Sequence, residues 1–302
     1  MKKLTSILVL VFVPLLLWAQ QDLPQDYLPK EFHAQRREAL RKLMPANSVA
    51  AVFAFPERTY SNDVTYPFHQ NPDLYYLSGY KEPNSVLLIF KEAQKGTDGA
   101  EYKELFFVQK RNAMAEQWTG RRLGTEGVKK NLGFEQVLNG EDFKAFPLDL
   151  SRFDHVIFDE LPTDLRNNVR DGADLYDLLQ TFREKAGIET SYDHAMSRMI
   201  ENLKSLPGAN FDRAKRSYTG MVNNNEKYKN TILQEFTALK DSSELKAFQE
   251  RISSPKFQDL SRLTAALREI KTPEEIELLR KAVQISSYGQ EEVMKVIQPG
   301  MS

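Results

Sequence analysis

Short, continuous runs of apolar residues recur through the first half of the chain. They cover residues 48–55 (SVAAVFAF), 86–90 (VLLIF), 105–108 (LFFV) and 156–158 (VIF). Runs of this length, rich in β-branched and aromatic residues, are typical of strands that are covered on both faces. Pro56 closes the first run, because proline cannot continue a central strand. The pattern predicts a largely buried sheet.

Helical spacing of apolar residues appears between and after these runs. Residues 33–44 (HAQRREALRKLM) place four apolar side chains near one stripe, and Pro45 ends that helix. Residues 174–184 and much of 191–203 show the same spacing. Strands that alternate with helices indicate an α/β fold, with a mixed β-sheet flanked by helices.

The last third of the chain is polar and helix-favouring, with few strand signals. From about residue 209 to 267 we expect helices, broken at residues 223–225 (NNN) and 253–255 (SSP). Thr272, Pro273 and Glu275 then form the start of a strongly capped helix that runs to about Gln298. Its apolar stripe needs a partner, and the residues that form it are Ile276, Leu279, Val283, Val293, Val296 and Ile297.

The N-terminal residues have the features of an export signal. Lys2 and Lys3 precede a twelve-residue apolar run at residues 7–18, and Ala19 is a suitable last residue before cleavage. The run is short for a bilayer and is interrupted by Pro14. We therefore expect a secretory signal peptide at residues 1–19 and a periplasmic or secreted protein. An uncleaved membrane anchor is the alternative.

Charge and cysteine content narrow the possible functions. The 302 residues include 41 Lys and Arg against 42 Asp and Glu, a formal net charge of −1, which argues against bulk electrostatic binding of nucleic acid. The chain has no cysteine, which excludes disulfides, Cys-ligated zinc, a thiol nucleophile and an acyl-cysteine anchor. We expect no nucleic acid partner, and no membrane contact after signal cleavage.

A search for catalytic motifs leaves two regions that are dense in polar, turn-forming and aromatic residues. The four histidines form no His-Glu-x-x-His pair, and no Gly-x-Ser-x-Gly elbow or Walker-type glycine loop occurs. The basic stretch at residues 110–130 is more typical of a solvated loop than of a site for an acidic ligand. The dense regions are residues 60–80, which end in FHQNPDLYYLSGY, and residues 116–124 (EQWTGRRLG). A tryptophan in a Gly/Arg loop needs a packing partner.

At these residues the chain resembles a known family. The segments EFHAQRREAL, AVFAFPERTYSNDVTYPFHQNPDLYYLSGYKEPNSVLLIF and RNAMAEQWTGRRLG resemble the N-terminal domain of aminopeptidase P, a pita-bread metallopeptidase of the creatinase/prolidase type. KTPEEIELLRKAVQISSYGQEEVMKVIQPGMS resembles its connector and first catalytic-domain helix. Residues 161–267 follow no family pattern that we can align. The resemblance implies an N-terminal domain at residues 20–267, then a linker and the first helix of an absent pita-bread catalytic domain at residues 268–302.

The resemblance also implies a function, which the intact enzyme performs with two divalent metal ions, typically Mn²⁺. The family removes an N-terminal residue that precedes proline, and its metal ligands are two aspartates, a histidine and two glutamates in the catalytic domain. No position of this sequence matches them, so we assign no catalytic residue and no metal ligand, and expect no Mn²⁺ on this chain. Either the sequence is a fragment or the gene is naturally truncated.

The resemblance implies that the two dense regions help to form the wall of an active site and do not carry out the reaction. In homo-oligomeric relatives the N-terminal domain helps to wall a neighbouring subunit's active site, which implies that Asp63 and Trp118 are substrate-proximal. The substrates would be peptides with proline at position two. We expect His69, Asn71 and the nearby tyrosines to be structural residues, whose polar groups are satisfied by the backbone of the loop.

Two other interpretations stay open at this stage. The chain could be a stand-alone, non-catalytic binding or assembly module derived from the family. It could also be a relative of the creatine-type amidinohydrolases, but the loop at residues 118–122 and the signal peptide suit aminopeptidase P better.

Overall fold

The computed structural model describes residues 28–62, 64–96, 99–165, 167 and 173–301. The predicted signal peptide and Asp63 lie outside the described residues. Two compact units are distinguished, Lys30–Ile270 and a second unit that includes residues 271–301. The bounds that we predicted for the domains stay a prediction.

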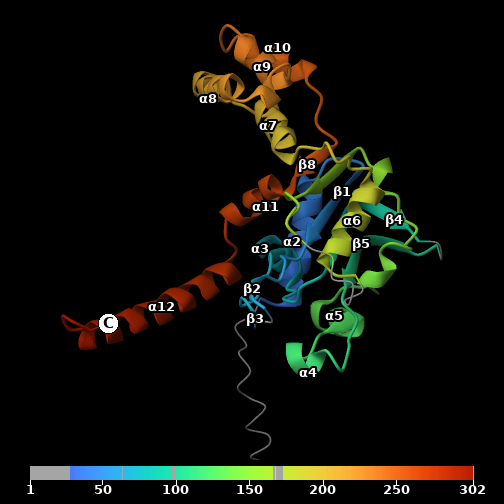
Figure 1. Ribbon diagram of the computed structural model, residues 1–302, viewed down its shortest axis with the longest axis vertical. Helices are drawn as coiled ribbons and strands as arrows, with labels where there is room; N and C mark the ends of the chain where they lie inside the picture. The colour runs from blue at the N-terminus through green and yellow to red at the C-terminus, as the bar shows by residue number, and fades with distance from the viewer. Residues whose placement is uncertain (1–27, 63, 97–98, 166, 168–172, 302) are drawn as a thin grey trace, which may run out of the picture. The chain divides into compact units, whose positions relative to one another are not determined.

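The unit Lys30–Ile270 is built on a mixed sheet (Figure 1). Its described strands run in the order β6–β5–β4–β1–β7–β8. β1 pairs antiparallel with β4 and parallel with β7, while β5 pairs antiparallel with β4 and parallel with β6, and β8 is parallel to β7. This confirms the predicted α/β class. The strands are β1 (Ser48–Phe53), β4 (Val86–Lys95), β5 (Glu101–Val108), β6 (Val137–Asn139), β7 (His155–Phe158) and β8 (Phe257–Asp259).

Both faces of this sheet are covered, which explains why its strands read as unbroken apolar runs. Alternate residues of β1, such as Val49 and Ala51, join one core cluster with Phe182 of α6 (Leu175–Ala186). The other face carries α2 (Lys30–Leu43), α3 (Pro72–Ser78) and α11 (Leu260–Glu269), which contact β4, β1 and β7 respectively.

A helical segment between α6 and β8 has a core of its own. It comprises α7 (His194–Lys204), α8 (Phe211–Asn224), α9 (Ile232–Ala238) and α10 (Leu245–Arg251). The breaks that we predicted near residues 223–225 and 253–255 are confirmed by the ends of α8 and α10. The three-residue strand β8 was not predicted, because FQD is too short to show a period. The buried core residues of this segment are Leu203, Phe211, Val222, Leu233, Phe236, Leu245, Phe248 and Ile252.

The second unit contains α12 (Pro273–Val296), the predicted capped helix. Thr272 N donates to Glu275 Oε2 over 2.9 Å, and Glu275 N donates to Thr272 Oγ1 over 3.4 Å, so the capping box is complete. Its apolar side chains are exposed, including Leu279 and Val283. Among the described helices, none combines the length and hydrophobicity that crossing a lipid bilayer requires.

Candidate functional site

Trp118 lies on α4 (Glu116–Thr119), one turn of helix in the connection between β5 and α5 (Gly124–Leu132). Its side chain is 90% exposed, the highest exposure of the large hydrophobic residues that the structure describes. An indole left in water is costly unless a partner covers it. The side chain of the predicted loop tryptophan lies almost entirely in solvent on this chain.

The loop that carries Trp118 is fixed by its own polar side chains. Arg111 makes a two-pronged contact with Glu116, from Nε to Oε1 over 3.0 Å and from Nη2 to Oε2 over 2.7 Å. This hydrogen bond lowers the pKa of Glu116. Asn112 Oδ1 accepts from Met114 N and Ala115 N, so it caps the turn that leads into α4. These hydrogen bonds fix the conformation of the loop, while the side chain of Trp118 stays exposed.

A polar cavity of about 340 Å³ lies beneath this loop. Charged groups of both signs line it, among them Lys110 and Glu141, which form an ion pair of 2.8 Å. At the end of the loop, Leu123 N donates to Glu82 Oε1 over 2.7 Å. Lys110 pairs with Glu141 and Glu116 pairs with Arg111, so part of the charge that lines the cavity is matched within the protein.

The segment FHQNPDLYYLSGY is mainly structural, as predicted, with one exception. Asn71 caps α3 by accepting from Asp73 N, and its Nδ2 donates to Phe53 O over 2.8 Å. Tyr80 is fully buried and donates to Glu82 Oε2 over 3.0 Å. The expectation for His69 was wrong, since its side chain is exposed. It lies in the connection before α3.

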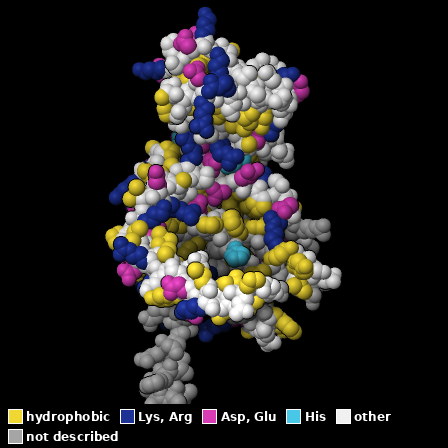
Figure 2. Space-filling model, turned by 90° about the vertical axis from the view of Figure 1, so that its left-hand side faces the viewer, with side chains coloured by type: hydrophobic (Ala, Val, Ile, Leu, Met, Phe, Trp, Pro, Cys, Tyr) yellow, Lys and Arg dark blue, Asp and Glu magenta, His cyan; other side chains and the backbone are white. Residues whose placement is uncertain are grey.

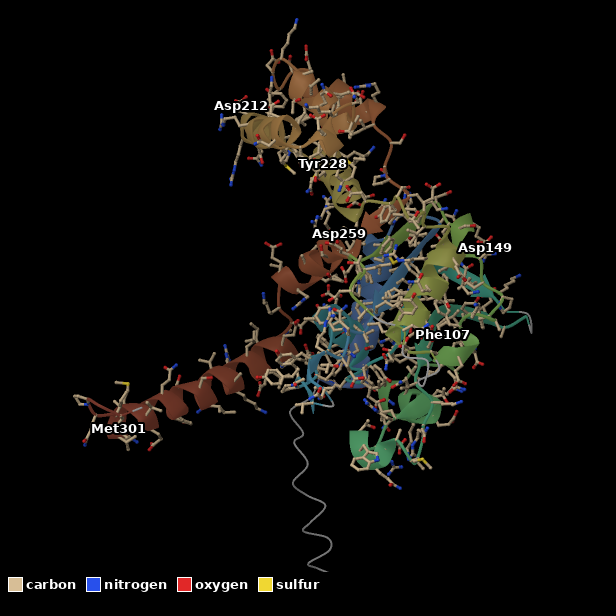
Figure 3. All side chains as sticks on the ribbon, viewed as in Figure 1. Phe107, Asp149, Asp212, Tyr228, Asp259 and Met301 are labelled. Atoms are coloured by element: carbon tan, nitrogen blue, oxygen red, sulfur yellow. The ribbon has the colours of Figure 1, made fainter. Side chains whose placement is uncertain are left out.

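Three aspartates from distant parts of the sequence form a second polar cluster. Asp159 follows β7, Asp259 ends β8 and caps α11 (Figure 3), and Asp73 lies in the first turn of α3. α11 is tied to α3 through Asp73, which accepts from Thr264 Oγ1 and pairs with Arg268, both over 2.8 Å. We name Asp73, Asp159 and Asp259 the carboxylate cluster.

The pKa values of Asp159 and Asp259 are shifted in opposite directions. Burial, together with the charges of Asp73 and Asp259, raises the pKa of Asp159 to about 6. The pKa of Asp259 is lowered to about 2, because hydrogen bonding and the nearby His194 outweigh its burial. His194 Nε2 lies 4.0 Å from Asp259 Oδ1. The pKa of Asp159 thus lies close to neutral pH, whereas that of Asp259 lies far below it.

The cluster does not fit a metal pair. The oxygens of Asp73 accept from Thr264 and Arg268, and Asp259 Oδ1 accepts from the backbone N–H of Ser261, so protein donors already use these ligand atoms. Within the described part of the chain, no group of three or more histidines, aspartates and glutamates is arranged to hold a metal ion.

Comparison with known families decides the relationship. A family model described as "Aminopeptidase P, N-terminal domain" matches residues 33–156. The chain carries an aminopeptidase P N-terminal domain. The matched region holds the Trp118 loop, the FHQNPDLYYLSGY segment and the sheet from β1 to β6, and it reaches the start of β7.

Known relatives extend well beyond the region that they share with this chain. The chain is 37% identical over 116 residues to the Xaa-Pro aminopeptidase of Haemophilus influenzae, which covers 38% of this chain and 26% of that protein. It is 38% identical over 104 residues to the Xaa-Pro aminopeptidase of Escherichia coli, or 34% of this chain and 22% of the relative. The shared region is thus about a quarter of these relatives' length.

Solved structures show the same fold over most of the chain. A variant of Escherichia coli aminopeptidase P superposes with a TM-score of 0.55 at 23% identity, over 91% of this chain and 46% of that one. Proline aminopeptidase P II from Yersinia pestis gives 0.55 at 23% identity, over 91% and 47%. The aminopeptidase P N-terminal fold, with helices after it, is therefore present here.

Sequence reasoning missed the carboxylate cluster, two members of which, Asp159 and Asp259, lie beyond the residues that the family model matches. Asp159 stands directly after a predicted strand, and that position was a usable signal, because strand ends meet at one edge of a sheet. Asp259 gave no such signal, since β8 was not recognised. No described contact tests the roles of Trp118 or Asp63 toward a substrate.

Proposed function

We propose that this chain is the N-terminal part of an exported Xaa-Pro aminopeptidase, which removes an N-terminal residue that precedes proline. On its own it would be inactive, and would serve oligomerisation and the walling of a neighbouring subunit's active site. The observation that carries the proposal is the aminopeptidase P domain at residues 33–156, with a rigidly supported, exposed Trp118. Export is supported by Lys2, Lys3 and the apolar run at residues 7–18.

The chain's own residues would bind and orient the peptide rather than cleave it. The flat face of Trp118 suits a proline ring or a peptide backbone, and the carboxylate of Asp63 would pair with the substrate's α-ammonium. A pair of divalent ions, which we propose to be Mn²⁺, would supply activation of water and stabilisation of the oxyanion in the intact enzyme. The described residues do not fit that pair, so it would be held elsewhere.

The inactivity of this chain is directly testable. We expect the purified 302-residue chain, incubated with Mn²⁺ and an Xaa-Pro peptide, to release no free N-terminal residue, because no described residues form a metal site. Chromatography of the released amino acid measures this, with Escherichia coli aminopeptidase P as the positive control. Metal-dependent turnover that a chelator abolishes would refute the proposal. Sequencing beyond the codon for Ser302 separates the N-terminal-part interpretation from the stand-alone module, which predicts an immediate stop.

Trp118 should contribute to self-association without supporting the fold. Because its side chain is 90% exposed, we expect Trp118→Ala to leave the thermal midpoint within about 1 °C, while it weakens self-association by about 2 kcal/mol, or roughly thirtyfold. Sedimentation velocity over a concentration series measures the association constant. Met114→Ala, which removes another exposed side chain of the same loop, is the matched control. Equal association by the wild type and both variants would remove Trp118 from the subunit contact.

A further inference from the structure

A second cavity lies apart from the Trp118 loop. It is an open groove of about 1020 Å³ between the connection from β1 to β2 (Thr59–Ser61), the connection after β3 (Val64–Thr65) and the segment after β7. Figure 2 shows a hollow on one face of the molecule, in which a histidine lies among hydrophobic side chains. We call this the aromatic groove. The residues that line it are Phe55, Pro56, Arg58, Thr59, Tyr66, Pro67, Phe68, His69, Glu160, Leu161, Pro162, Thr163 and Asp164.

The walls of the aromatic groove are made of rings that water reaches. Phe55 is 45% exposed and Tyr66 is 54% exposed, and three prolines stand between and opposite them. The ring of Tyr60 packs edge to face on that of Tyr66, with 5.2 Å between the ring centroids. Large apolar side chains gathered around one concave surface, rather than scattered, mark an interaction site.

The groove is preformed, because hydrogen bonds fix both of its banks. Phe55 N donates to Gln70 Oε1 over 3.2 Å, and Tyr66 N donates to Arg58 O over 2.9 Å. Arg58 bridges to Asp164 on the opposite bank with two bonds, of 2.6 and 3.1 Å. A ligand would therefore meet a groove that needs little ordering, which lowers the entropic cost of binding.

The charge on the rim selects among ligands. Arg58 and Asp164 neutralise one another through their paired bonds. Glu160 then leaves an excess of negative charge among the lining residues, and its side chain is exposed. A ligand with a positive charge beside its apolar rings is complementary to this surface.

We propose that the aromatic groove binds an extended, proline-rich peptide segment that also carries basic residues. Grooves lined by aromatic side chains recognise polyproline II segments, because proline rings stack on them and the ligand is already ordered. The proposal rests on the proposed function and deepens it. The substrates would be basic peptides with further prolines after the second position. The N-terminal domain would bind the part of the peptide that follows that position.

Fluorescence anisotropy with a labelled peptide of alternating proline and arginine tests this on the full 302-residue chain. We expect saturable binding, and at least about tenfold weaker binding when every proline is replaced by alanine at constant charge. Phe55→Ser combined with Tyr66→Ala should weaken binding about tenfold or more. Thr163→Lys, which places a cation at an exposed position of the groove and removes no ring, should also weaken it. Tyr288→Ala, which changes an exposed aromatic residue outside the groove lining, is the matched control.

The outcomes distinguish this proposal from the proposed function. Equal binding of the alanine peptide would overturn recognition of proline, and equal binding by the groove variants would overturn the location. Neither result would touch the turnover and Trp118 experiments, which test the proposed function separately. If the groove variants instead reduce self-association in sedimentation velocity, the groove is a contact between copies of this chain and the peptide proposal is wrong.

Discussion

Replacing Arg37 with alanine is expected to lower the free energy of unfolding by about 3–5 kcal/mol, because it breaks a buried charge pair and leaves Glu104 with only one of its two arginine partners. Arg37 is 3% exposed. Its Nε lies 2.9 Å from Glu104 Oε2 on β5, and its Nη1 donates to Leu77 O at the end of α3 over 2.8 Å. The guanidinium also lies 4.0 Å above the ring of Phe134. One side chain thus ties α2 to three other parts of the domain.

Urea unfolding followed by circular dichroism measures this loss. Lys42→Ala is the matched control, because Lys42 is an exposed basic residue on the same helix, and its replacement should change stability by no more than about 0.5 kcal/mol. Adding Glu104→Ala to Arg37→Ala should cost less than Glu104→Ala costs alone, since the two groups share an interaction. Arg41, which also pairs with Glu104 over 2.8 Å, would keep part of the network. A loss below 1 kcal/mol for Arg37→Ala would show that the buried pair does not hold these elements together.

Much of the fold could be predicted because its signals are local. The apolar run of β1 is unbroken, since neighbouring strands and helices on both faces bury every residue of it. The start of α12 was readable from Thr272 and Glu275 alone, because a capping box involves residues only three apart. The helix α2 was predictable because its apolar residues recur at helical spacing within a short stretch, although it begins earlier than predicted, at Lys30.

The rest depends on contacts between residues far apart in the sequence. Asp73 and Arg268 are separated by 195 positions, and nothing near either of them indicates the ion pair. The aromatic groove gathers three short connections, each of which reads simply as a turn-rich loop. The expectation that His69 is internal was wrong for the same reason. Its neighbours in the sequence suggest an internal fixing, whereas its exposure is decided by which elements happen to cover that loop.

Asp159→Asn is expected to stabilise the protein at alkaline pH and to have little effect at acid pH. The pKa of Asp159 is raised from 3.8 to about 6, by burial first and then by Asp73 and Asp259. A raised carboxyl pKa means that the folded state holds the proton more tightly than the unfolded state does. The ionised side chain therefore costs stability, and that cost grows as pH rises from about 4 to above 6. Asparagine carries no charge, so the variant should be more stable by about 1–3 kcal/mol at pH 8 and equal to the wild type near pH 4.

Urea unfolding of both proteins at pH 8, 6 and 4.5 measures the difference, and Asp259→Asn provides a control of opposite sign. Because the pKa of Asp259 is lowered to about 2, its ionised form stabilises the folded state above about pH 4, and this contribution is lost as pH falls toward 2. Asp259→Asn should therefore destabilise the protein at neutral pH. If Asp159→Asn were less stable than the wild type at pH 8, its carboxylate would be held by interactions that outweigh burial and the repulsion from its two neighbours. The carboxylate cluster at the junction of β7, β8 and α3 would then not be electrostatically strained.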